Sequence, residues 1–261
     1  MKKQFKLFWV VITSVLCAAI VIGAIIFHTS RDRIEGSFFR KMYGSIGIAN
    51  EEDYAMQLNL FSYEKDVPFL HDHEHLSFDN ANVKIVDLSY DVQKVDYDLT
   101  VYSVLVTIKM QEVGQHEVTS LVYIGNGEEE TVYPIGNIHF IYNDDASDFL
   151  LHGCNTNIDD GKAVFQFSAE NDRAFTITDV LIADDKLSKY SFEKNVPFTP
   201  GNDLVYTINV DSSVSEYDLL VLQPIFEIQF NDSSEKQYFS PYMIVFRGSD
   251  MTYDEIKEYV R

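Results

Sequence analysis

The sequence has few cysteines, little positive charge and no complete catalytic motif, and each shortage excludes a class of protein. Its 261 residues include only two cysteines. Cys17 lies in an apolar N-terminal run, so Cys154 has no partner, and a fold stapled by disulfides is excluded. We expect Cys154 to be a small buried apolar side chain rather than a nucleophile.

Positive charge is scarce beyond the first few residues. The chain carries 41 acidic residues against 20 lysines and arginines, for a formal net charge of −21. Lys2, Lys3 and Lys6 all precede the first acidic residue, Asp32, so the remainder of the chain is more acidic still. Such a surface repels phosphate backbones, and we expect no binding to nucleic acid.

Motifs that carry catalysis are missing or incomplete. The sequence has no Gly-x-Ser-x-Gly, no phosphate-binding loop and no zinc-protease helix. Ser-x-x-Lys occurs at Ser62/Lys65 and Ser191/Lys194, but the strand-like surroundings turn the serine and the lysine to opposite faces. We therefore expect a protein that is not an enzyme and, apart from one candidate zinc site, has no cofactor.

One long apolar run is present, at the N-terminus. Only Thr13 and Ser14 interrupt it between residues 7 and 27. As a helix this run spans roughly 31 Å, which matches the hydrocarbon core of a bilayer. The sequence therefore predicts a transmembrane anchor over 7–27 after a cytoplasmic tail over 1–6, with the lipid bilayer as the first expected partner.

A cleaved signal peptide and a lipoprotein signal are the alternatives to an anchor. The run is longer than the core of a usual signal peptide and continues past any small-residue cleavage site. Leu16 precedes Cys17 where a lipoprotein signal has a small residue. Nearly equal numbers of basic residues flank the run on its two sides, so the count of positive charges does not fix the orientation. Acidic residues do little to stop translocation, so the long acidic region can still cross the membrane. We therefore expect a single-pass protein of a bacterial cell membrane with its C-terminal region extracytoplasmic.

Beyond a juxtamembrane transition expected over 28–50, the sequence has the period-two alternation of β-strands. Alternating runs include residues 86–92, 102–110, 206–210, 226–230 and 242–246. In "FTITDVLIAD" the alternation slips at Asp179, which predicts a β-bulge. Regular short strands without intervening helical periodicity favour antiparallel sandwiches.

These patterns predict an all-β fold with two antiparallel immunoglobulin-like β-sandwich domains, over 51–150 and 151–248. Polar, acidic stretches between 143 and 163 favour a boundary there. Thr252 and Glu255 have the spacing of a capping box, so a short C-terminal helix is expected within 249–261.

A near-repeat and a histidine cluster adjoin in the first half of the chain. "FSYEKDVPF" (61–69) nearly recurs as "YSFEKNVPF" (190–198), through either domain duplication or coincidence in an aromatic β-protein. His71, His73 and His75 follow in "HDHEH". In an extended strand, the Cα atoms of neighbouring histidines in this set are roughly 6.6 Å apart, which suits two ligands of one zinc ion. The Cα atoms of His71 and His75 are roughly 13 Å apart, so a straight strand offers at most two of the three. The alternative is a solvated loop.

The sequence thus predicts a membrane-anchored, extracytoplasmic β-sandwich protein that acts as a non-catalytic interaction or accessory module. Its expected partner is another membrane or surface protein. The alternative is a surface module that binds a metal ion or a cell-wall carbohydrate, and fold alone does not choose the partner.

Overall fold

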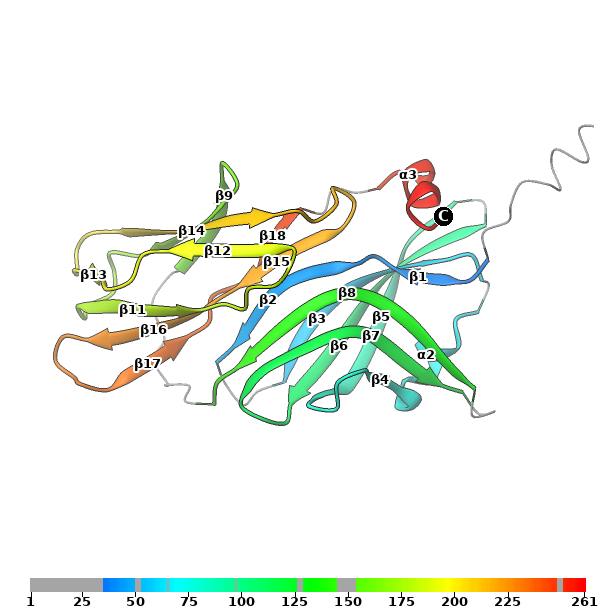
Figure 1. Ribbon diagram of the computed structural model, residues 1–261, viewed down its shortest axis with the longest axis horizontal. Coiled ribbons are helices and arrows are strands. Elements are labelled where there is room, and N and C mark those ends of the chain that lie inside the picture. The colour runs from blue at the N-terminus through cyan, green and yellow to red at the C-terminus, as the bar shows by residue number, and fades with distance from the viewer. Residues whose placement is uncertain are drawn as a thin grey trace, which may run out of the picture. The chain divides into compact units, whose positions relative to one another are not determined.

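The strands of the described residues form four β-sheets (Figure 1). The computed structural model describes residues 35–49, 53–64, 66–96, 98–125, 129–144, 154–247 and 251–261. The strand-rich fold that the alternation predicts is confirmed over these ranges. The anchor expected at 7–27 lies outside them, and none of the helices inside them is long and apolar enough to span a membrane.

The first two sheets enclose one core. A four-stranded antiparallel sheet has the order β1-β3-β6-β5 and consists of β1 (Ser37–Phe39), β3 (Tyr54–Ser62), β5 (Val83–Asp96) and β6 (Leu99–Met110). A six-stranded sheet has the order β18-β15-β2-β8-β7-β4 and consists of β2 (Met42–Ile48), β4 (Leu76–Phe78), β7 (Gly114–Ile124), β8 (Glu130–Tyr142), β15 (Leu219–Gln223) and β18 (Ile244–Arg247). Their alternating apolar side chains, with Phe69 from the short helix α2 (Pro68–His71), form the first core.

The other two sheets enclose a second, phenylalanine-rich core. One has the order β13-β11-β16-β17, from β11 (Phe175–Leu181), β13 (Val196–Phe198), β16 (Ile225–Phe230) and β17 (Lys236–Phe239). The other has the order β12-β14-β10-β9, from β9 (Cys154–Asp159), β10 (Lys162–Phe167), β12 (Ser188–Phe192) and β14 (Leu204–Ser212). Asp160 and Gly161 both have positive φ and close the β9–β10 hairpin tightly, as in a type I′ turn.

The chain passes between the two sandwiches at several points, and at one of them a continuous extended segment belongs to both. β15 belongs to the six-stranded sheet, and after Pro224 the chain continues as β16 in the sheet around the second core. Proline suits this position because it donates no ladder hydrogen bond where the strand changes sheets. The boundary expected between 150 and 151 falls outside the described ranges and stays a prediction, but the contacts group Gly36–Val260 as one unit.

Residues 36–48 correct the expectation of a juxtamembrane transition over 28–50, because they contain β1 and β2. β2 runs parallel to both of its neighbours, β8 and β15, so the six-stranded sheet is mixed rather than purely antiparallel. One face of β2 enters the first core through Met42 and Ile46. On its other face, Ser45 Oγ accepts a hydrogen bond from the Ala183 amide at 3.0 Å. Both faces of β2 are therefore covered, and the strand has no row of polar side chains facing water.

The predicted C-terminal helix is confirmed as α3 (Tyr253–Tyr259). Thr252 is its N-cap, and Glu255 completes the capping box. So short a helix needs docking to be stable. Ile256 is buried beside Phe61, and the Tyr259 hydroxyl donates to Asp218 Oδ1 at 2.8 Å.

Both copies of the near-repeat lie where the chain passes from one sheet of a sandwich to the other. The first copy begins with the last two residues of β3 and leads through α2 to β4, and the second begins in β12 and ends with β13. In each copy the last phenylalanine, Phe69 or Phe198, is buried in the core of its own sandwich. The shared role is compatible with the duplication hypothesis, although one copy ends in a helix and the other in a strand.

Candidate functional site

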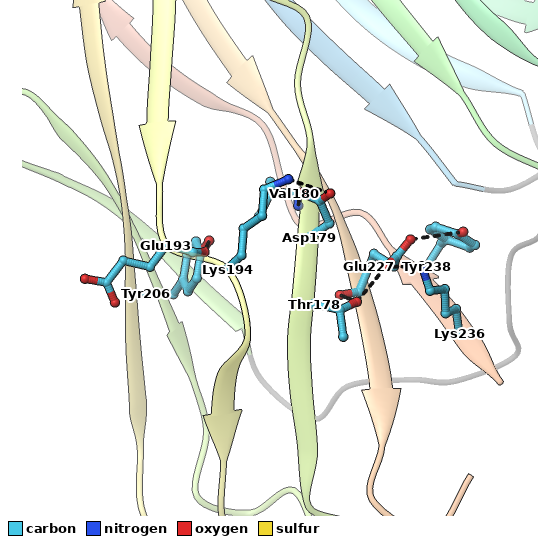
Figure 2. A network of polar contacts seen from close by, with 9 residues as sticks. All are labelled: Thr178, Asp179, Val180, Glu193, Lys194, Tyr206, Glu227, Lys236 and Tyr238. Carbon is cyan, nitrogen blue, oxygen red and sulfur yellow. Dashed lines mark hydrogen bonds and ion pairs between the residues drawn. The ribbon is translucent and has the colours of Figure 1, made fainter. Parts of the chain in front are cut away.

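The β-bulge predicted at Asp179 is confirmed, and it organises the candidate site. The β11–β16 register pairs Ile177 with Ile228 and then Asp179 with Glu227, so Thr178 is the extra residue. Asp179 Oδ1 accepts a hydrogen bond from the Val180 amide at 2.8 Å. Its other oxygen, Oδ2, lies 2.7 Å from the Lys194 ammonium (Figure 2). The bulge thus fixes a carboxylate at the end of β11.

Lys194 reaches Asp179 from the connection between β12 and β13. The neighbouring Asn195 has φ +58°, which turns the chain sharply. The Tyr206 hydroxyl donates to the Glu193 carbonyl oxygen and holds the connection against β14 (Figure 2). Burial raises the pKa of Tyr206, and Asp179 and Glu193 raise it further. The hydroxyl therefore remains a neutral donor at physiological pH, and the lysine is presented from a tethered loop.

Glu227 lies on β16 opposite the bulge, is mostly buried, and is the centre of a polar network. Its Oε1 accepts from Thr178 Oγ1 at 2.6 Å and lies 2.8 Å from Lys236 Nζ, while Tyr238 donates to Oε2 at 3.4 Å (Figure 2). Burial alone raises the pKa of this carboxyl, but the hydrogen bonds from Lys236 and Thr178 outweigh burial and lower it. The network holds the bulged strand to its neighbours.

Replacing Glu227 with glutamine is expected to lower the free energy of unfolding at pH 7 by about 1–3 kcal/mol, because a charge-assisted buried contact is lost. The pKa of the Glu227 carboxyl is lower in the folded state. Its contribution is therefore complete above the unfolded pKa, near 4.3, and disappears as pH falls through the folded pKa.

Urea unfolding of both proteins, followed by circular dichroism from pH 7 down to pH 3, measures this difference. The gap between wild type and Glu227→Gln should narrow as pH falls. Asp232→Asn is the control, because Asp232 pairs with Arg173 at 2.7 Å but its side chain is 71% exposed. If Glu227→Gln and Asp232→Asn lower the free energy of unfolding equally at pH 7, the result would contradict the stabilising role of the buried network around Glu227.

An open groove of about 500 Å³ lies beside the Asp179–Lys194 pair. This volume is within the range of roughly 300–1,000 Å³ that is usual for ligand sites. We call it the junction groove, because its walls come from both sandwiches. It is lined by Val113, Gly114, Gln115, Ile141, Tyr142, Asn143, Asp144, Asp179, Val180, Leu181, Ile182, Phe192 and Lys194.

The lining of the junction groove suits binding through mixed contacts. Apolar side chains such as Leu181 and Phe192 offer surface for burial, and Gln115 offers an amide. Two carboxylates and one ammonium, from Asp144, Asp179 and Lys194, supply the charge. These groups can orient a ligand or a peptide.

The lone thiol lies elsewhere. Cys154, on β9, is free and partly buried, and burial raises its pKa to about 12. Because only the thiolate is strongly nucleophilic, this thiol is inert at neutral pH. The interpretation of Cys154 as an apolar packing residue agrees with this environment.

The histidine cluster does not form the extended strand on which the zinc spacing depends. Pro68 begins the helical turn α2, which ends at His71, and η1 (His73–His75) follows as a 3₁₀ turn. Proline favours the first turn of a helix, and this preference ends the strand pattern. His71 Nε2 lies 3.3 Å from Asp66 Oδ1, and His75 Nε2 lies 4.0 Å from Asp72 Oδ1.

Across the described ranges, no three His, Cys, Asp or Glu side chains are grouped closely enough to hold a metal ion. Zinc binding by His71, His73 and His75 thus stays a prediction from the sequence.

No pattern in the sequence predicts the junction groove. Only the slip in alternation at Asp179 pointed toward it, and that slip predicted a bulge rather than a site. Lys194 is 15 residues away in the chain, and Asp144 lies on the other sandwich. No local spacing could have connected these residues.

Comparisons with known proteins add little to this description. No protein-family model and no curated protein matches the chain. A protein of unknown function from Porphyromonas gingivalis W83 is similar at 11% identity over 78% of this chain and 97% of that chain, with a TM-score of 0.22. The C-terminal domain of the Streptococcus agalactiae AgI/II polypeptide BspA is similar at 6% identity over 80% of this chain and 99% of that domain, with a TM-score of 0.21. At these scores neither likeness assigns a function.

Proposed function

We propose that the protein is a non-catalytic interaction module that binds another membrane or surface protein through the junction groove. In this proposal residues 7–27 anchor the chain in a bacterial cell membrane, and the immunoglobulin-like sandwiches lie on the extracytoplasmic side. The junction groove is the observation that carries the proposal. It combines apolar walls with a few fixed polar groups, which is the usual composition of a binding site.

The rigidity of the surroundings supports binding rather than passive spacing. Tyr54 donates to Gln223 Oε1 at 2.6 Å, and Ser240 donates to the Gly47 carbonyl at 2.7 Å. The first hydrogen bond joins the two sheets of the first sandwich beside the β15–β16 segment, and the second joins β2 of the first sandwich to the residue after β17 of the second. Walls that are fixed before binding lose less conformational entropy when a partner docks.

Site-specific photocrosslinking in intact cells tests the binding site. A photoreactive phenylalanine analogue is placed at Val113, which lines the groove and is 55% exposed, or at Val205, which is 59% exposed on β14. We expect one adduct of defined mass from position 113 and none from position 205. Equal labelling at both positions, or no adduct from position 113, would contradict the proposal.

Protease treatment of intact cells tests the topology. Digestion of the region beyond residue 36 without cell lysis is the expected result, and full protection would overturn the extracytoplasmic assignment. Saturable binding of zinc or of a cell-wall sugar, in a protein that forms no adduct, would favour the alternative of a ligand-binding module.

A further inference from the structure

We infer that the junction groove binds an extended, cationic peptide segment that presents a lysine or arginine next to an apolar side chain. The incoming cation takes the place of Lys194 at Asp179 and is also attracted by Asp144, while the apolar side chain packs on the groove walls. This inference rests on the proposed function and names the chemistry of the partner.

Asp179 is a prepared acceptor for a cation. The Val180 amide holds one carboxylate oxygen at 2.8 Å, so the direction of the other is fixed. Among the described residues, that other oxygen is paired only with Lys194, whose side chain is 55% exposed, while Asp179 is 33% exposed. Ion pairs this open to water contribute little net stability, so a second cation can displace the lysine.

The charge around the groove favours a cation over an anion. Asp144 and Asp179 face a single lysine among the lining residues. Glu112 and Glu193 stand next in the chain to Val113 and Lys194. The chain as a whole carries a formal net charge of −21, and a field of this sign raises the encounter rate of basic segments.

The apolar part of the groove defines the second requirement. Val113 is 55% exposed, and Phe192 is only partly buried against the second core. Leu181 is also only partly buried, against the apolar cluster between the sandwiches. An apolar side chain that covers these groups removes their surface from water, and this burial supplies affinity that a free lysine lacks.

Fluorescence anisotropy with the full-length chain in non-ionic detergent tests the inference. The probes are three fluorescein-labelled hexapeptides in which leucine alternates with lysine, with glutamate or with serine. We expect the lysine peptide to bind more tightly than the serine peptide, and the glutamate peptide to bind least. Added sodium chloride should weaken the binding of the lysine peptide, because salt screens exposed charges.

Variants give the sharper readout, because the sign of the Lys194 effect depends on the ligand charge. Lys194→Met removes the competing cation and is expected to tighten binding of the lysine peptide about two- to fivefold, the scale of an exposed charge pair. Asp179→Asn is expected to weaken it by a similar factor. Lys189→Met is the matched control, since Lys189 is exposed on β12 outside the groove and its loss should not change binding by more than the general charge effect.

The outcomes separate the two proposals. Weaker binding of the lysine peptide to Lys194→Met, or a preference for the glutamate peptide, overturns the cationic partner. If no peptide binds while position 113 still forms its cellular adduct, the inference about peptide chemistry fails and the proposed interaction module stands. If the adduct is also absent, both fail. Unchanged circular dichroism of each variant, together with the same result from Lys194→Gln, excludes misfolding as the cause.

Discussion

Replacing Gly44 with alanine is expected to destabilise the protein by at least about 4 kcal/mol, enough to prevent folding in a marginally stable domain. Gly44 has φ +133°, and a Cβ built there would lie 1.9 Å from the carbonyl oxygen of Val221. Val221 is its partner in the parallel β2–β15 pairing. The clash is with backbone, so relief requires the strands to separate and their hydrogen bonds to break.

Gly114 offers a matched control for this experiment. Its φ is +132°, nearly the same as at Gly44, but a Cβ there meets nothing within 4 Å. Gly114→Ala should therefore cost only the backbone strain, about 1–3 kcal/mol. Urea unfolding followed by circular dichroism compares the two variants. If Gly44→Ala is no less stable than Gly114→Ala, the result would contradict the close backbone contact between β2 and β15 at Gly44.

Replacing Phe226 with alanine is expected to lower the free energy of unfolding by about 3–5 kcal/mol. The ring is fully buried, and its centroid lies 5.1 Å from that of Phe165, 5.4 Å from Phe167 and 5.3 Å from Tyr206. These edge-to-face contacts add to the burial of the ring itself. Rings on three other positions surround the vacated space, so the cavity cannot close easily.

Val205→Ala is the control for this variant, because Val205 neighbours Tyr206 on β14 but is 59% exposed. Its effect should stay within about 0.5 kcal/mol. Chemical denaturation of both variants in the same detergent measures the difference. A loss below about 1.5 kcal/mol for Phe226→Ala would show that the second core is more loosely packed than the ring distances indicate.

Local chemistry was enough to predict the parts of the fold that depend on neighbouring residues. In β6 the residues from Val104 to Met110 alternate between buried and more exposed, because one face of the strand meets the core and the other does not. The bulge beside Asp179 appeared as a slip in this alternation, and the capping box at Thr252 depends on residues three apart. Each of these signals lies within a few residues of the feature that it predicts.

The parts that the sequence did not reveal depend on contacts between distant residues. β2 contains Gly44 and Gly47 and is covered on both faces, so it lacks the polar alternation of an exposed strand. Its parallel pairing with β15 is set by shape at those glycines, which no local pattern records. The junction groove is hidden for the same reason, since Asp144 and Lys194 line one groove only because the tertiary fold brings the two sandwiches together.

The pairing of β2 with β15 also limits when the six-stranded sheet can complete its folding during synthesis of the chain. β2 (Met42–Ile48) lies early in the described residues and β15 (Leu219–Gln223) lies late, so the six-stranded sheet remains open until β15 has been synthesised. Contacts between such distant segments make folding slow. A nascent or truncated chain that stops before Leu219 exposes one edge of β2, and unpaired edges of this kind promote aggregation. Chaperones that keep the early strands apart are therefore most needed until β15 has been synthesised.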